Sequence, residues 1–228
     1  EQTRDMAQRI NAFFVAREES VLDKLIDIGG LEQQETFEIQ AKGIAPEGFD
    51  PAKALNTPEI TITVHSSRDQ YDTYMFFGDG QGERLRYRED NVLEPGGEIQ
   101  PIYTLTLMGP AKEAELENSV VLSRARYTAP ADRSLRFYRE YFAPTAIREV
   151  SKHRERYHIR YKGVDLAVNV DRITAPPQPK LYIEIKSRTW SQQDAYRKAS
   201  LIGELLHLLG SQPEDMLGQE YVDLVSTD

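Results

Sequence analysis

The feature that most constrains the fold is an alternation of apolar and polar side chains with a period of two, which recurs along the chain. In the segment LYIEIKSR, at residues 181–188, leucine and isoleucine alternate with tyrosine, glutamate and lysine. Successive side chains of a β-strand point to opposite faces. The segment is therefore predicted to be a strand with one apolar face and one charged face.

The same pattern predicts most of the secondary structure. Strands are expected at residues 36–42, 60–64, 72–77, 84–88, 103–108, 120–127, 152–160, 164–173 and 181–188, and helices at 5–28, at 134–142 and from Ser191 to Gly210. Few helices separate the strands and no βαβ rhythm is present. We therefore expect an α+β fold, namely a closed or nearly closed antiparallel β-barrel of about eight strands with helices packed outside.

The division into domains follows from the same pattern. Residues 1–30 are predicted to form an N-terminal helical extension, and residues 31–228 the barrel domain. We expect the N-terminal helix to pack on the barrel or to contact a further domain or partner. Trp190 is expected to pack at the end of its strand rather than to stack on a nucleobase.

Composition excludes several classes of protein. The chain has 228 residues, a net charge of −9 and no cysteine, so disulfides, thiolate catalysis and cysteine metal sites are excluded. No apolar run approaches the roughly 20 residues that cross a bilayer, and no signal peptide is recognisable. We therefore expect a cytoplasmic protein with no membrane partner. Nucleic acid is not expected as a partner, because an acidic surface repels it.

Positive charge is nevertheless concentrated on the polar faces of the predicted strands. Residues 148–162 contain six Arg or Lys and two Glu, although the whole chain is acidic. The ordinary interpretation is a sheet with one solvated face, but solvated faces usually mix both signs of charge. If the sheet closes with its apolar face outward, the cations line a tunnel. Such a tunnel needs a polyanion, since uncompensated buried charge is costly.

The polar faces carry a recurring set of short motifs, namely Glu38-x-Gln40-x-Lys42, Arg86-x-Arg88, Lys152-x-Arg154 and Glu184-x-Lys186. In their order and strand parity these motifs resemble the CYTH domains, or triphosphate tunnel metalloenzymes, from residue 37 to Gly210. The resemblance implies a tunnel that binds a triphosphate or nucleotide ligand. Its Arg-x-Arg and Lys-x-Arg motifs and its first strand imply catalytic cations at Lys42, Arg86, Arg88, Lys152 and Arg154. Further cations are expected to bind the substrate phosphates, namely Arg84, Arg124, Arg126, Arg156 and Lys186.

This chain has fewer acidic residues at the motif positions than the family pattern. The resemblance implies Glu38, Glu184 and Asp171 as metal ligands and Mg²⁺ or Mn²⁺ as the cofactor. Such hard cations commonly take one or two carboxylates together with substrate phosphates. Where the family has further glutamates, this chain has Gln40, Arg126, Thr128 and Lys186. The basic half of the site is thus kept, while the metal-holding half is reduced.

These features leave three functional hypotheses. The first, which we slightly favour, is a metal-dependent triphosphatase-type phosphohydrolase acting on inorganic triphosphate or a nucleoside triphosphate. The retained acids support it. The second is a non-catalytic domain that binds or senses a triphosphate or nucleotide, and the missing carboxylates favour it. The third is an adenylate cyclase or a polyphosphate-polymerase-like activity, because the family resembled also includes such enzymes and a fold does not fix a reaction.

Overall fold

A computed structural model describes residues 20–29, 36–78, 82–109, 114–116 and 120–225. The chain divides into two compact units, residues 1–32 and 33–228. In the first unit, helix α2 spans Val21–Gly29. The rest of the helix predicted at residues 5–28 lies outside the described residues. Within the described part, no helix combines the length and the apolar character that spanning a membrane requires.

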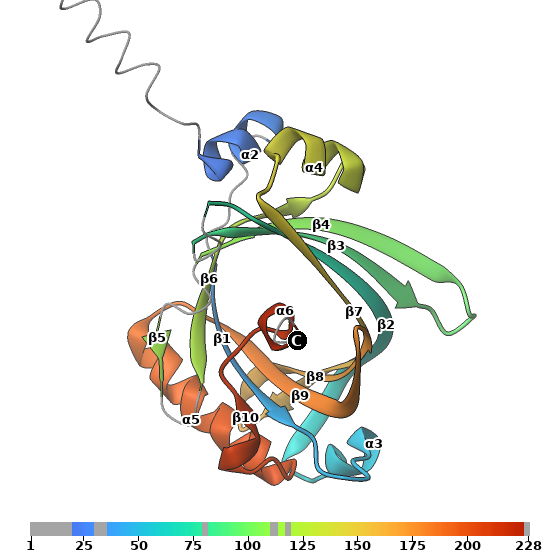
Figure 1. The fold of residues 1–228 in the computed structure, drawn as a ribbon. Coiled ribbons are helices and arrows are strands. Elements are labelled where there is room, and N and C mark those ends of the chain that lie inside the picture. The colour runs from blue at the N-terminus through green and yellow to red at the C-terminus, as the bar shows by residue number, and fades with distance from the viewer. Residues whose placement is uncertain (1–19, 30–35, 79–81, 110–113, 117–119, 226–228) are drawn as a thin grey trace, which may run out of the picture. The chain divides into compact units, whose positions relative to one another are not determined.

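The second unit is built on one antiparallel sheet (Figure 1). Its strands are β1 (Thr36–Ile44), β2 (Ile60–Phe76), β3 (Arg84–Leu93), β4 (Ile99–Met108), β5 (Ala114–Glu115), β6 (Val121–Pro130), β7 (Ala146–Tyr161), β8 (Val164–Ala175), β9 (Pro177–Thr189) and β10 (Met216–Leu217). Strand β1 pairs with β9 and also with β6. The eight long strands of the described part therefore close into a ring, which confirms the predicted antiparallel barrel.

The helices of this unit are short except for one. They are α3 (Pro51–Ala54), α4 (Leu135–Phe142), α5 (Gln192–Leu208), the 3₁₀ helix η2 (Pro213–Asp215) and α6 (Tyr221–Leu224). Helix α5 begins at Ser191, whose hydroxyl accepts a hydrogen bond from the backbone N–H of Asp194 at 3.2 Å, as expected for an N-cap.

Helix α5 explains why the charged faces of the strands point inward. Its residues Ile202 and Leu205 are fully buried and belong to one core cluster with Ile39 of β1 and Ile183 of β9. The apolar faces of these strands are therefore covered on the outside of the ring. Because side chains alternate along a strand, the polar faces must then line the interior.

Two regions differ from the predicted pattern. The strands expected at 60–64 and 72–77 are one continuous strand, β2, because β7 pairs with it along almost its whole length, with a register shift between Ile62 and Val64. The polar segment between them shows no alternation, yet β7 pairs with it throughout and β3 pairs with it from Ser67 onward. Helix α6 is an exception to the external placement of helices, since it lies within the ring of strands (Figure 1).

Candidate functional site

The interior of the ring contains a dense set of buried charges. Lys42, Lys152, Arg154 and Glu184 are each at most 3% exposed. Lys42 lies opposite Glu184 across the β1–β9 pair, and Arg154 lies opposite Asp171 across the β7–β8 pair. Strand register therefore places cations next to carboxylates. Such pairing is needed, since a buried charge without a partner is strongly destabilising.

The first group of ion pairs is centred on Asp72. Its carboxylate accepts two hydrogen bonds from Arg88, at 2.5 and 2.7 Å, and one from Nζ of Lys152 at 2.7 Å. Burial alone would raise the pKa of Asp72, but Arg88 and Lys152 outweigh it and hold the pKa well below its usual value. Burial, together with Arg88 and Arg154, lowers the pKa of Lys152 to about 8 although Asp72 opposes the shift.

The second group is centred on Arg154. Its guanidinium donates to both oxygens of Asp171 at 2.6 Å and to Glu184 at 2.7 Å. Glu184 also accepts a hydrogen bond from Nδ2 of Asn169 at 3.1 Å and lies 3.4 Å from Nζ of Lys42. Burial would raise the pKa of Glu184, but Lys186, Arg154 and Lys42 together keep it well below its usual value. Glu184 is therefore ionised, and both acids already contact cations of the protein.

Helix α6 brings further carboxylates into the same interior. Glu220, at its N-cap, accepts hydrogen bonds from Gln40 at 2.8 Å and from Lys42 at 2.9 Å. Burial would raise the pKa of Glu220, but Lys42 and Lys186 outweigh it and hold the pKa at about 2. At the other end of the helix, Asp223 accepts two hydrogen bonds from Arg84, at 3.0 and 3.2 Å.

The aromatic and apolar side chains of α6 fix it in place. The Tyr221 hydroxyl donates to Asp171 at 2.8 Å, and Nζ of Lys42 lies 5.0 Å from the centre of the Tyr221 ring. Val222 is fully buried and shares an apolar cluster with Tyr74 and Tyr182. This end of the tunnel, which we call the closed end, is therefore filled by the chain itself.

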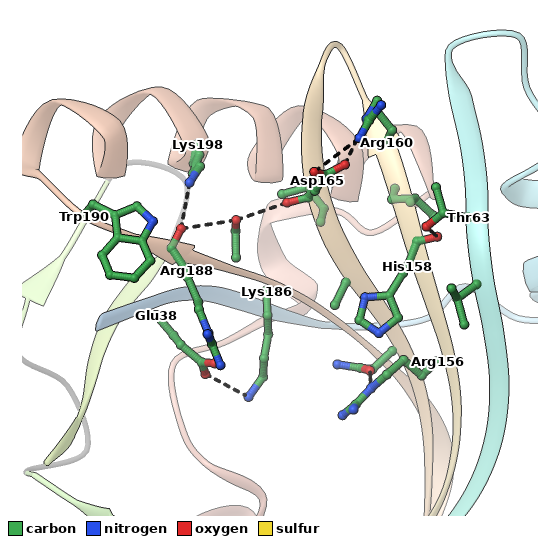
Figure 2. A pocket seen from close by; sticks show the side chains of 16 residues that line it. Glu38, Thr63, Arg156, His158, Arg160, Asp165, Lys186, Arg188, Trp190 and Lys198 are labelled. Atoms are coloured by element: carbon green, nitrogen blue, oxygen red, sulfur yellow. Dashed lines mark hydrogen bonds and ion pairs between the residues drawn. The ribbon is translucent and has the colours of Figure 1, made fainter. Parts of the chain in front are cut away.

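The opposite part of the interior is open. A cavity of about 910 Å³, which we call the basin, is lined by Arg156, Lys186, Arg188, Trp190 and Lys198, among other residues (Figure 2). Nε of Arg156 donates to Asn169 at 2.9 Å. Burial, Arg154 and Arg68 lower the pKa of Arg156 to about 10, although Asp90 opposes the shift. The basin is thus the part of the tunnel that still has room and charge for an anion.

The structure brings many of the predicted site residues to the central ion pairs. These are Lys42, Arg88, Lys152, Arg154, Asp171 and Glu184. Their predicted roles in binding, metal ligation or catalysis stay predictions. Asp72, Asn169, Glu220 and Asp223 were not assigned a role from the sequence, although the strand parity of Asp72 relative to Arg88 was a signal for the first of them.

The remaining predicted residues lie elsewhere. Arg84 pairs with Asp223 at the closed end, whereas Glu38, Arg156 and Lys186 line the basin. A smaller cavity of about 70 Å³ adjoins the basin at Glu38 and Lys186, and Arg86 lines it. Nε of Arg86 is buried and has no hydrogen-bond partner among the described residues. The side chains of Arg124 and Arg126 fall outside the described part.

The carboxylates fit a divalent cation poorly in this arrangement. Among the described residues, no three or more acidic, histidine or cysteine side chains gather as a metal site would require. Asp171 is held by Arg154 and Tyr221. Glu38 and Glu184 approach a common point, but Nζ of Lys186 lies there, 3.9 and 3.6 Å from their oxygens. The ammonium group thus stands where a cation bridging these two acids would stand.

Comparison with known proteins identifies the fold family. A search of curated proteins gives no match. Among solved structures, the PH1819 protein from Pyrococcus horikoshii OT3 is similar with a TM-score of 0.61 and 18% identity, over 82% of this chain and 97% of that chain. A candidate adenylate cyclase from Vibrio parahaemolyticus is similar with a TM-score of 0.57 and 13% identity, over 85% of this chain and 100% of that chain.

A third structure, the capping enzyme triphosphatase of Mimivirus, gives a TM-score of 0.43 and 11% identity over 83% of this chain and 95% of that chain. At 18% and 13% identity, the first two structures support the fold alone. The CYTH domain family, in contrast, matches residues 36–213, which cover the ring of eight strands and α5. This chain therefore belongs to the CYTH domain family.

Proposed function

We propose that this domain binds the triphosphate group of a phosphorylated substrate in its tunnel and hydrolyses it. The observation that supports the proposal most is the contrast between the central cations and those of the basin. Arg154 and Lys42 are satisfied by buried carboxylates, whereas Arg156 faces open space with only an amide oxygen as its partner among the described residues. A cavity with unbalanced positive charge is suited to an anionic ligand.

The chemistry of phosphoryl transfer suits this arrangement. Such reactions depend mainly on positioning the phosphoryl group and on neutralising the charge of its oxygens. Arg86 and Arg156 can each hold phosphate oxygens through two N–H groups, and Lys186 supplies a compact charge between them and the acids. Water entering through the basin would be the nucleophile for a phosphohydrolase. The supporting geometry is that Lys186 of β9 lines both cavities, with Arg156 of β7 in the basin and Arg86 of β3 in the smaller cavity.

The proposed cofactor, Mg²⁺ or Mn²⁺, is the part of the hypothesis that this conformation supports least. The acids expected to hold it already contact Lys42, Arg154 and Lys186. No step of the reaction is therefore assigned to a metal. This observation favours a second candidate function, in which the domain binds a triphosphate without turning it over.

Phosphate release decides between these two functions. Tripolyphosphate and ATP should be assayed with Mg²⁺, with Mn²⁺ and with a chelator, alongside binding by calorimetry. Turnover supports a hydrolase, and its dependence on metal tests the cofactor. Tight binding without turnover supports the sensing domain, and absence of both contradicts the proposal.

A matched pair of variants tests whether the basin is the site. Arg156→Gln should weaken tripolyphosphate binding about 10- to 100-fold, because a charge-assisted hydrogen bond is lost. Arg136→Gln is the control, since Arg136 is exposed on α4 and pairs with Glu140. Equal affinity in both variants would argue against a phosphate site in the basin.

A further inference from the structure

The basin is larger than a phosphate site needs. Its volume of about 910 Å³ lies within the roughly 300–1,000 Å³ typical of pockets for organic ligands. Its inner part is lined by Arg156 and Lys186, which adjoin the buried ion pairs through Asn169 and Glu184. Its outer part contains Trp190 together with the charged side chains of Arg160, Asp165 and Lys198, whereas Ala167 pairs with Lys186 and lies at the inner level. The cavity is therefore charged along its whole length, and the indole of Trp190 adds an aromatic surface at its outer part.

Trp190 lies at this outer part and does not pack as expected from the sequence. Its side chain is 81% exposed, so the expectation that it packs at the strand end is wrong. Trp190, Arg188 and Glu38 all line the basin (Figure 2). A single exposed aromatic residue is ordinary on a protein surface. An exposed indole that lines a cationic cavity is less so, because it adds a π face to a charged site.

The backbone around Trp190 is held from both sides. Nζ of Lys198 donates to the carbonyl of Arg188 at 2.7 Å and to Asp194 at 2.8 Å. The Thr189 hydroxyl contacts the carbonyl of Ser191 at 3.2 Å and Asp194 at 3.1 Å. These contacts join the end of β9 to the first turn of α5. They present the indole to the basin from a fixed position while leaving its ring uncovered.

Lys186, Arg188 and Trp190 share one strand parity, and all three line the basin. Four residues of extended chain separate the first from the last, which corresponds to about 13 Å. A triphosphate group that reaches Lys186 therefore leaves the outer part of the same cavity for the remainder of the substrate. Arg188, which is exposed between the two, faces the region where the two parts would join.

We propose that Trp190 is a stacking platform for the nucleobase of the substrate, which makes the substrate class a nucleoside triphosphate rather than inorganic triphosphate. This inference rests on the proposed function, because it assumes that the phosphates lie near Lys186 and Arg156. Aromatic side chains stack on any base, so Trp190 supplies affinity for a nucleotide with little preference among bases.

The chain offers a direct readout, since Trp190 is its single tryptophan. Titration of the intact protein with ATP, CTP or GTP should quench Trp190 fluorescence, whereas tripolyphosphate should bind with little quenching. Trp190→Ala should weaken ATP binding roughly 5- to 150-fold by calorimetry and leave tripolyphosphate affinity unchanged. Trp190→Phe should restore most of the ATP affinity, because phenylalanine retains a π face.

The control variant is Tyr196→Ala. Tyr196 is also an exposed aromatic residue on α5, at 50% exposure, and is not among the residues lining the basin. The Tyr196→Ala variant should bind ATP with the same affinity as the unmodified protein. A 5′-triphosphate oligoribonucleotide distinguishes the two sources of a base-linked triphosphate, an RNA end and a free nucleotide, because its affinity can be compared with that of ATP by calorimetry. Quenching and sensitivity to Trp190→Ala support the inference with either source.

The failures of the two proposals are distinguishable. If tripolyphosphate binds but nucleotides bind no more tightly, and Trp190→Ala changes neither, the stacking platform is overturned while the phosphate site stands. If nucleotides bind without quenching Trp190 and without sensitivity to its replacement, the base lies elsewhere and the inference is again overturned. If neither tripolyphosphate nor any nucleotide binds, both proposals fail together.

Discussion

The closed end and the basin of the tunnel are lined by the same kinds of side chain but are neutralised in different ways. At the closed end, Arg84 and Lys42 are paired with Asp223 and Glu220 of the C-terminal segment. In the basin, the only hydrogen-bond partner of the Arg156 side chain among the described residues is the amide oxygen of Asn169. The number of cations on inward faces is therefore larger than the number that can bind a ligand. The position of the acids decides which cations remain available to a ligand.

The largest effect is expected at the junction between the two regions. Arg154→Met should lower the free energy of unfolding by about 3–5 kcal/mol, because it leaves Asp171 and Glu184 buried without their shared partner. Urea denaturation measures it. The control, Arg160→Met, removes an exposed pair with Asp165 and should change stability by less than about 1 kcal/mol. If both variants lose a similar free energy of unfolding, the buried central ion pairs contribute no more to stability than the exposed pair.

Anion binding should stabilise the protein through the basin. Tripolyphosphate at a hundredfold excess over its dissociation constant should add about 2.7 kcal/mol to the free energy of unfolding, if it binds the folded state alone. Thermal denaturation with and without the anion measures the shift. In Lys186→Glu the stabilisation should shrink, because the variant places a like charge beside the bound phosphates. If tripolyphosphate leaves the melting temperature of the unmodified protein unchanged, the basin does not bind the anion and does not differ from the closed end in this respect.

The pH dependence of stability should report the burial of Lys152 beside Arg88 and Arg154. The pKa of Lys152 is lowered to about 8 from 10.5, so between these values the unfolded state binds more protons. Stability should therefore rise with pH through this window, by the order of 2–3 kcal/mol from Lys152 alone. The measurement is the difference between the unmodified protein and Lys152→Met from pH 8 to 9.5. Parallel stability curves would contradict the lowered pKa.

The smallest effect concerns the C-terminal segment. Glu220→Gln removes one negative partner of Lys42 and should raise tripolyphosphate affinity about tenfold, because a positive charge in the interior becomes less neutralised. Calorimetry measures the affinity. Glu204→Gln is the control, since Glu204 lies outside the tunnel and pairs with the exposed Lys162. Unchanged affinity in Glu220→Gln would mean that the closed end is electrically separate from the basin.

Strand parity accounts for much of what the sequence could predict. The alternation in β1 and β9 correctly indicated that Lys42 and Glu184 share one face, because a period of two is a local property. The ion pairs could not be read in the same way. Arg154 meets Asp171 and Glu184 through the register of three different strands, and register depends on the whole ring.

The positions of residues 218–225 and of Trp190 were harder to predict from the sequence. Nothing local in residues 218–225 indicates that Tyr221 enters the barrel, since its contacts come from segments far away in the chain. The continuity of β2 was also hidden, because its central residues are polar on both faces. Trp190, in contrast, shares the parity of Lys186 and Arg188, and that parity was a usable signal for its place in the basin.

The double pairing of β1 has a consequence for how the protein is made. Its two partners among the long strands, β6 and β9, follow much later in the chain. During synthesis from the N-terminus, β1 emerges long before either partner exists, and the ring closes only after β9 has left the ribosome. Such distant pairing slows folding and leaves strand edges exposed in the meantime. Nascent chains that stop before β9 should therefore depend on chaperones, whereas the finished ring should not.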